Sequence, residues 1–314
     1  MRGWIQGKRI IVTGGAGFVG LNLVKRLRSE GAVITVPVRR NHPPNQPGVE
    51  FRAVDLLDLE AVLQLVRDVR PDSIIHSAAA GYHPIAPKDR IDSLAVATLG
   101  TAHLLEAALE CGINRALYLG GSTVYPMQPH AMQESQAPDP VTFRGAGKAS
   151  GSIIWRQFAK ATGLRAAELR LFSVYGPHEA ETRFIPKLLR AAWDEVPFPL
   201  LRGPRHDFIY AEDVADACVR ALEQPLPAGE IVNIGTGIQS SNEEVVALVE
   251  QVTGRRVRIV EGEFPRRAWD SEAWRADTTR AENLLGWRAA TRLHDGLQQT
   301  FEWLRTERWP VCSS

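Results

Sequence analysis

The chain has 314 residues, 44% of them hydrophobic, and 37 Lys and Arg balance 36 Asp and Glu to a formal net charge of +1. This length allows one large core, and the balanced charge gives no general attraction to nucleic acid or to a membrane surface. Cys111, Cys218 and Cys312 form no Cys-x-x-Cys pair and no metal-ligand cluster, so neither a disulfide nor a metal site is expected.

The sequence shows no apolar signal segment and no uncharged apolar run of the roughly 20 residues that a membrane-spanning helix needs. We therefore expect a soluble, cytoplasmic protein with reduced thiols.

From residue 8 to about 170, short β-branched runs alternate with amphipathic segments such as Leu21–Arg28, Leu59–Val69 and Leu94–Ala108. This alternation predicts an α/β fold of the Rossmann type, a doubly wound parallel sheet with helices on both faces. The predicted strands are Arg9–Thr13, Val33–Val38, Val49–Val54, Ser73–Ser77, Ala116–Gly120 and Ala166–Leu171.

A glycine loop follows the first predicted strand, with Gly14, Gly17 and Gly20 spaced three apart around Phe18 and Val19. Gly14 suits a tight turn, Gly17 permits close approach of a pyrophosphate, and Gly20 favours packing of the helix on the strand. Because a helix N-terminus also attracts phosphate, this segment predicts dinucleotide binding.

The second predicted strand ends in Arg39 and Arg40, where NAD-binding proteins usually carry an acidic residue for the ribose 2′-hydroxyl. Two guanidinium groups there suit a 2′-phosphate, which favours NADP(H) as the cofactor. The alternative is that Arg39 and Arg40 are simply exposed to solvent at the end of the strand and that NAD(H) is bound through other contacts.

Beyond about residue 175 prolines become frequent and the elements shorter. We expect an NAD(P)-binding domain over residues 1–175 and a smaller substrate-binding lobe over residues 176–314, with some crossing of the chain between them. Within this lobe, Ser241 and Glu244 form a capping box before a helix at Val245–Val252, and Gly254 ends it.

Several ordered motifs extend the glycine loop across the chain: Asp55-Leu56, Gly100-Thr101, Val124-Tyr125, Lys148, Val174-Tyr175-Gly176-Pro177, Asp207 to Val214, Asn233 to Gly237 and Leu285-Gly286-Trp287. This pattern resembles the extended short-chain dehydrogenase/reductases, in their nucleotide-sugar epimerase/dehydratase branch. The resemblance covers essentially the whole chain.

The resemblance implies cofactor contacts from Asp55 and Leu56 beside the adenine and from Ala78, Ala79 and Ala80 near the nicotinamide ribose. A nucleoside diphosphate sugar would lie in the smaller lobe. Its binding residues are expected among Tyr82, Tyr125, Ser173, Arg183, Arg205, His206 and Arg266.

Family catalysis is expected to use a Tyr-x-x-x-Lys pair and a hydroxyl residue. The matching segment keeps Lys148 but has Arg144 in place of tyrosine, and the hydroxyl position falls on Gly121, followed by Ser122 and Thr123. A guanidinium stays protonated and is a poor acid or base. Lys148 would then bind the cofactor ribose or itself transfer the proton.

Other groups offer alternatives for the proton transfer. Tyr82 and Tyr125 carry a phenol, and His83 and His206 carry an imidazole, although each of these side chains more often packs or binds substrate than transfers a proton. Ser173 replaces an asparagine that is frequent in the family, and Ala97 replaces another.

Two functions follow from this pattern. The first is an NADP(H)-dependent oxidoreductase, epimerase or dehydratase of nucleotide sugars with an unusual proton relay, with reduction of a keto-sugar favoured. The second is a catalytically degenerate protein that binds the cofactor in a structural or regulatory role. The family also implies a homodimer through the helices near Leu94–Ala108 and Lys148–Ala161.

Overall fold

The main sheet contains seven parallel strands in the order β11-β6-β5-β4-β1-β2-β3 in the computed structural model, which describes residues 3–39, 47–79, 87–260 and 271–309. The sequence predicted six of these strands to within about a residue or two at each end, and the Rossmann-type fold is confirmed. The strands are β1 (Arg9–Thr13), β2 (Val33–Val38), β3 (Val49–Ala53), β4 (Ser73–His76), β5 (Arg115–Gly121), β6 (Arg165–Leu171) and β11 (Ile231–Ile234).

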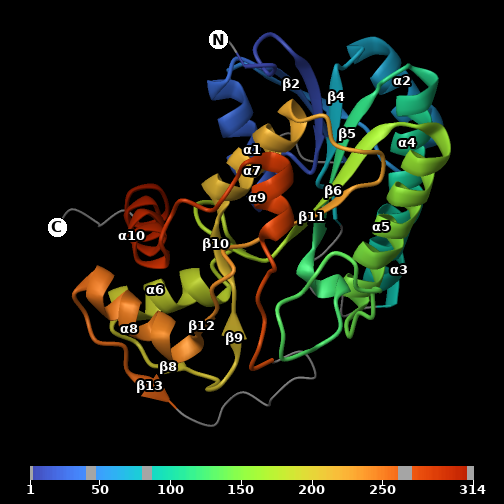
Figure 1. The fold of residues 1–314 in the computed structure, drawn as a ribbon. Coiled ribbons are helices and arrows are strands. Elements are labelled where there is room, and N and C mark those ends of the chain that lie inside the picture. Colours follow the sequence, from blue (N-terminus) through green and yellow to red (C-terminus); the bar gives the residue numbers. More distant parts are fainter. Residues whose placement is uncertain (1–2, 40–46, 80–86, 261–270, 310–314) are drawn as a thin grey trace.

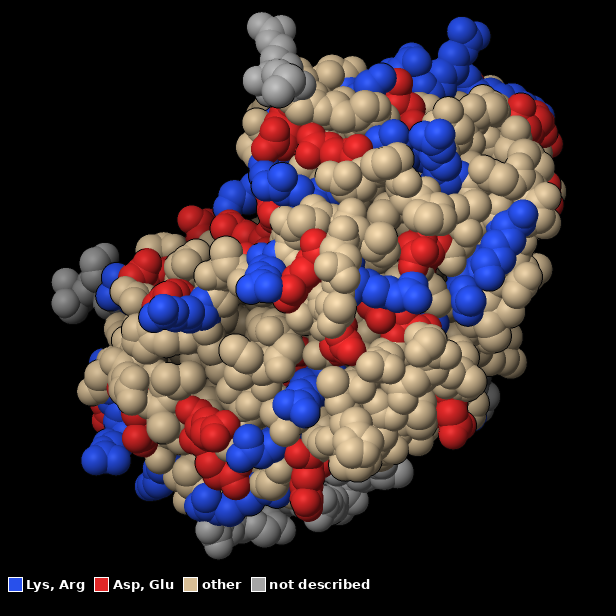
Figure 2. Space-filling model, in the orientation of Figure 1, with Lys and Arg blue, Asp and Glu red and all other residues tan. Residues whose placement is uncertain are grey.

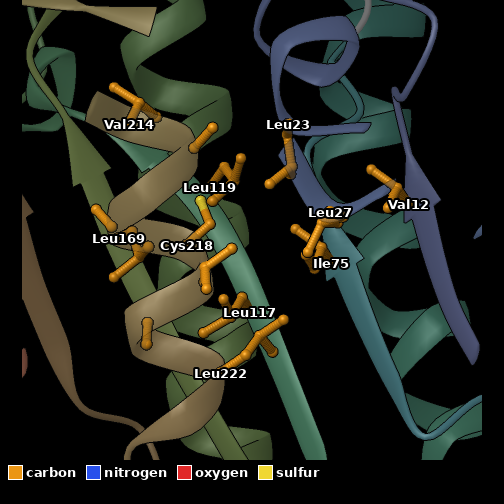
Figure 3. Packing of buried hydrophobic residues seen from close by; sticks show 14 of the residues in the cluster. Val12, Leu23, Leu27, Ile75, Leu117, Leu119, Leu169, Val214, Cys218 and Leu222 are labelled. Carbon is orange, nitrogen blue, oxygen red and sulfur yellow. The ribbon is translucent and has the colours of Figure 1, made fainter. Parts of the chain in front are cut away.

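Helices cover both faces of this sheet (Figure 1). On one face α1 (Phe18–Ser29) and α7 (Ala211–Glu223) pack side by side, and their apolar residues meet those of the strands (Figure 3). The other face carries α2 (Leu59–Val69), α4 (Thr101–Glu110) and α5 (Phe143–Thr162). Burial on both faces is typical of parallel strands and explains their uninterrupted apolar runs.

A segment from later in the chain supplies the last strand of the main sheet and one of the helices that cover it. Strand β11 pairs in parallel with β6, so that Val232 lies opposite Leu169, and α7 also comes from beyond residue 175. The chain therefore leaves the main sheet after β6 and returns to its edge.

Three further helices gather at the lower left of the sheet in Figure 1, where α6 (Phe184–Asp194), α8 (Asn242–Thr253) and α10 (Leu293–Trp303) share a separate apolar core. Short strand pairs lie beside them. They are β7 (Ser173–Tyr175) with β10 (Phe208–Tyr210), β9 (Arg205–His206) with β12 (Ser240–Ser241), and β8 (Phe198–Pro199) with β13 (Ile259–Val260).

Helix α8 begins with the predicted capping box. The Ser241 hydroxyl accepts the Glu244 N–H at 3.1 Å, and the Glu244 carboxylate accepts the Ser241 N–H at 2.7 Å. Gly254 ends the helix with a φ of +68°. The helix predicted at Val245–Val252 is confirmed, with one further turn at its N-terminus.

The other short elements lie at the ends of the main layers. Helix α3 (Pro87–Ala95) continues through η1 (Val96–Gly100) into α4, and η2 (Ser122–Val124) follows β5 directly. Helix α9 (Thr279–Leu285) packs beside β11, and η3 (Leu304–Arg308) extends α10.

Candidate active site

A cavity of about 830 Å³ lies at the carboxyl ends of the parallel strands. Its wall runs from the glycine loop after β1, past the ends of β2, β4, β5 and β6, to β7 and the N-terminus of α6. Ligands of open α/β sheets bind at this edge, and the volume suits a small-molecule site.

The glycine loop forms one end of the cavity and has no room for side chains at two of its positions. Gly14 has a φ of +69°, and a Cβ on it would lie 2.8 Å from the backbone nitrogen of Ala78. A Cβ on Gly20 would lie only 2.1 Å from the carbonyl oxygen of Gly14. The chain thus exposes bare backbone and the start of α1 to the cavity, which fits a dinucleotide phosphate.

The other described residues predicted to bind the cofactor also line this cavity. All of them except Lys148 follow a strand, with Arg39 after β2, Asp55 after β3 and Ala78 after β4. The predicted residues in the cavity wall are Gly14, Gly17, Phe18, Val19, Gly20, Arg39, Asp55, Leu56, Ala78, Ala79 and Lys148.

Helix α5 presents Arg144 and Lys148 to the cavity one turn apart. The helix starts where the Thr142 hydroxyl accepts the Gly145 N–H at 3.0 Å. Lys148 is buried, and its Nζ donates to the carbonyl oxygen of Leu119 at 2.7 Å and lies 5.0 Å from the centre of the Tyr118 ring.

Burial lowers the pKa of Lys148 to about 7, and the charge of Arg144 contributes in the same direction. The buried Glu168 carboxylate acts in the opposite direction. Burial also lowers the pKa of Arg144. The ammonium of Lys148 therefore exchanges its proton more readily than an exposed lysine would.

Ser122 and Thr123 both line the cavity at the end of β5. Ser122 is buried, and its Oγ accepts a hydrogen bond of 3.0 Å from the indole Nε1 of Trp274. Trp274 is a cavity residue that the sequence did not indicate, since 152 positions separate it from Ser122.

The far end of the cavity contains Ser173, Arg183 and His206, three of the predicted substrate residues. The Oγ of Ser173 lies 3.5 Å from Nδ1 of His206 on strand β9. Burial lowers the pKa of Arg183 to about 10. Glu179 also lines the cavity, although no sequence motif pointed to it.

Two predicted substrate residues lie away from the cavity wall. Tyr125 is fully buried and donates through its hydroxyl to Oδ1 of Asn233 at 2.6 Å. Arg205 contacts the Glu244 carboxylate at 3.7 Å. The adjacent His206 faces the cavity instead, as the alternation of side chains along a strand requires.

Arg40, Ala80, Tyr82, His83 and Arg266 lie outside the described residues.

The described ranges contain no cluster of three or more His, Cys, Asp or Glu side chains that could hold a metal ion. Nor does any helix within those ranges have the length and apolarity to cross a membrane. On the face shown in Figure 2, basic and acidic side chains are interspersed, in keeping with the balanced net charge.

Comparisons with known proteins agree with the fold. Residues 10–235 match the model described as the NAD dependent epimerase/dehydratase family. A UDP-glucose 4-epimerase of Mycolicibacterium smegmatis is 29% identical over 95% of this chain and 99% of its own length. A dTDP-glucose 4,6-dehydratase of Streptomyces antibioticus is 26% identical over 95% of this chain and 93% of its own.

Among solved structures, MoeE5 in complex with UDP-glucuronic acid and NAD superposes with a TM-score of 0.85 and 29% sequence identity. The match covers 94% of this chain and 98% of that protein. The whole architecture, including the smaller group of helices, is therefore shared.

Proposed function

The chain belongs to the NAD-dependent epimerase/dehydratase family, and from that premise we propose that it is an oxidoreductase of a nucleotide diphosphate sugar, acting mainly as a keto-sugar reductase. The observation that carries this proposal is that one continuous cavity contains both groups of predicted residues. This cavity joins the glycine loop at one end to Lys148 and Arg144 in the middle and to Ser173, Arg183 and His206 at the other.

Different parts of the cavity suit the cofactor and the nucleotide diphosphate sugar. The bare backbone at Gly14 and Gly17 and the start of α1 accommodate the cofactor pyrophosphate. Arg183 and His206, together with Ser173, offer donors to a diphosphate and a sugar. Relatives named as UDP-glucose and dTDP-glucose enzymes support this substrate class.

The bound nicotinamide supplies or accepts the hydride. Lys148 binds the cofactor ribose, and because its pKa is lowered its ammonium group loses a proton more easily than an exposed lysine would. Arg144 cannot act as an acid or base, so its role is to stabilise negative charge on the sugar or on the developing alkoxide. Reduction of a ketone needs one proton delivered, and it tolerates the missing tyrosine better than a reversible epimerisation does.

The cofactor preference we propose is NADP(H). Arg39 lines the cavity directly after β2, where it can reach a 2′-phosphate, and no carboxylate occupies the described end of that strand. The family is NAD-dependent and NAD is bound in the solved MoeE5 complex, so NAD(H) is the alternative that a binding experiment must test.

A homodimer through α5 and its neighbours is also proposed. Ile91 on α3, Leu99 on η1 and Ile153 on α5 are 66%, 55% and 50% exposed, and these helices pack against one another. Several large apolar side chains on adjacent helices favour an interface between protein chains.

Single-turnover mixing tests the proposed function. Protein loaded with NADP or NAD is mixed with UDP-glucose, UDP-glucuronic acid or dTDP-glucose, and the absorbance of the reduced nicotinamide is followed. Oxidation of a sugar is the reverse of the proposed reduction and requires the same groups. Hydride transfer with at least one sugar is expected, whereas its absence with all of them would support the degenerate cofactor-binding protein.

The variant Arg144→Gln is the companion experiment. Loss of one preorganised charged donor should slow hydride transfer by about 100-fold. Lys160→Met, an exposed position on the same helix, is the matched control and should leave the rate unchanged. If Arg144→Tyr instead gives an inactive protein the ordinary family activity, the degenerate alternative gains support.

A further inference from the structure

Glu179 lies in the wall of the cavity, and one of the two oxygens of its buried carboxyl group has no hydrogen-bond partner among the described residues. Its side chain is 6% exposed. Oε1 accepts a single bond of 3.3 Å from Nε of Arg183, and Oε2 has no hydrogen-bond partner among the described residues. A buried polar atom without a partner is costly, so a bound ligand is the natural source of the missing one.

Backbone contacts hold this carboxyl in the wall of the cavity. The Glu179 N–H donates to the carbonyl oxygen of Gly176 at 3.2 Å, directly after β7. The preceding Pro177 carbonyl accepts a bond of 2.9 Å from Nδ2 of Asn22 on α1. The segment is therefore tied to the helix that follows the glycine loop, between the proposed cofactor end and the substrate end.

Several of the other acid or base candidates are occupied by hydrogen bonds or lie away from the cavity wall. Ser122 accepts from Trp274, and Tyr125 is bonded to Asn233 away from the cavity wall. Lys148 donates to Leu119. Within the described part of the wall, the carboxyl groups are Asp55, which lies at the adenine end by resemblance, and Glu179.

Resting on the proposed function, we propose that Glu179 is the proton donor and acceptor of this site, in place of the absent tyrosine. In its protonated form Oε1 accepts from Arg183, and Oε2 carries a hydrogen that points to no acceptor within the described chain. The oxygen of the reacting sugar carbonyl supplies that acceptor.

The reaction balances with this assignment. In the reductive direction the sugar carbonyl gains a hydride at carbon from the reduced nicotinamide, which is oxidised. It gains a proton at oxygen from Glu179, which becomes a carboxylate. In the oxidative direction the hydroxyl proton returns to that carboxylate while the hydride leaves the carbon.

The electrostatic environment is consistent with this role. Burial raises the pKa of Glu179 to about 8, while the backbone of Gly176 acts in the opposite direction. Arg183, four residues further along the chain, contacts the carboxyl and favours its charged form, but the effect of burial is larger. At neutral pH the group is therefore mostly protonated, ready to reduce a carbonyl.

The test compares Glu179→Gln and Glu179→Asp with the wild-type protein. Single-turnover oxidation of UDP-glucose and UDP-glucuronic acid is measured across pH, together with cofactor binding. We expect Glu179→Gln to bind cofactor normally and to lose about 10²- to 10⁴-fold in rate. The rate of the wild-type protein should rise with pH through about 8, and this rise should vanish in the glutamine variant. Glu179→Asp should recover part of the rate.

Melting temperatures give a readout that needs no catalysis. A carboxyl whose pKa rises from 4.5 to about 8 on folding stabilises the protein at low pH, and this stability is lost as the pH rises through that interval. Glu179→Gln should therefore become progressively more stable than the wild type from about pH 5 to about pH 9. The exposed neighbour Glu181→Gln is the matched control and should show no such trend.

The outcomes separate the two proposals. Hydride transfer in the wild type with an unchanged rate and pH profile in Glu179→Gln would overturn the role of Glu179 alone. Absence of hydride transfer in the wild type would overturn the proposed function, and the role of Glu179 with it.

Discussion

Nζ of Lys148 and the carbonyl oxygen of Leu119 are 2.7 Å apart, which joins the buried lysine of α5 to the end of β5. The lysine is held in the wall of the cavity, while burial and Arg144 lower its pKa to about 7. A lysine in this state affects stability as well as chemistry.

The first prediction concerns the pH dependence of that stability. The pKa of Lys148 falls from 10.5 to about 7 on folding, so the unfolded chain binds more protons over this interval. The contribution of Lys148 to stability is greatest above the pKa of the unfolded chain, and it decreases as the pH falls toward the pKa of the folded protein. The stability of wild type relative to Lys148→Met should therefore increase from about pH 7 to about pH 9.5, measured by chemical denaturation. An equal offset at every pH would contradict it.

The second prediction separates two glycines of the loop. A Cβ at Gly20 meets the Gly14 oxygen at 2.1 Å, whereas one at Gly17 meets the same atom at 3.2 Å. Gly20→Ala should lower the unfolding free energy by about 1–3 kcal/mol through overpacking. Gly17→Ala should fold almost normally and weaken cofactor binding, because its Cβ would extend toward the proposed pyrophosphate. Denaturation and fluorescence titration with NADPH measure the two effects, and identical behaviour of the variants would refute the distinction.

Local patterns predicted most of the main sheet because buried parallel strands are short β-branched runs between amphipathic helices. The seventh strand, Ile231–Ile234, was not predicted, since four residues beyond the proline-rich region carry too little periodicity. Its position beside β6 results from the return of the chain through α7.

The motif that begins at Asp207 holds two segments of the chain together. The buried Asp207 carboxylate accepts the backbone N–H groups of Thr236, Gly237 and Ala276 at 2.8, 2.9 and 3.0 Å. It thereby fastens the segment after β11 and the one leading to α9.

Trp274 and Glu179 could not be assigned to the site from sequence. Trp274 reaches Ser122 only through the tertiary fold. A glutamate in a polar loop normally reads as exposed, and only burial of its carboxyl beside the cavity distinguishes Glu179.

The third prediction tests the cofactor preference. If Arg39 contacts a 2′-phosphate, Arg39→Ala should weaken NADPH binding by about tenfold through loss of a charge-assisted bond. NADH lacks that phosphate, so its affinity should stay unchanged. Calorimetric titration of both cofactors gives the ratio. Equal affinities in the wild type, with no effect of the substitution, would remove the proposed preference and leave NAD(H).

The fourth prediction tests the proposed dimer. Leu99 on η1 and Ile153 on α5 are 55% and 50% exposed, on helices that pack together. If a second copy of the chain covers them, a charge introduced at either position is buried when the two copies associate. Burying an unpaired ion costs on the order of several kcal/mol, because the ion loses its hydration. Ile153→Asp and Leu99→Glu should therefore shift the protein to monomer in sedimentation velocity. Ile238→Asp, at a 72% exposed position after β11, is the control and should leave the assembly intact. A wild-type protein that sediments as a monomer across the accessible concentrations would instead mean that these side chains are simply solvated.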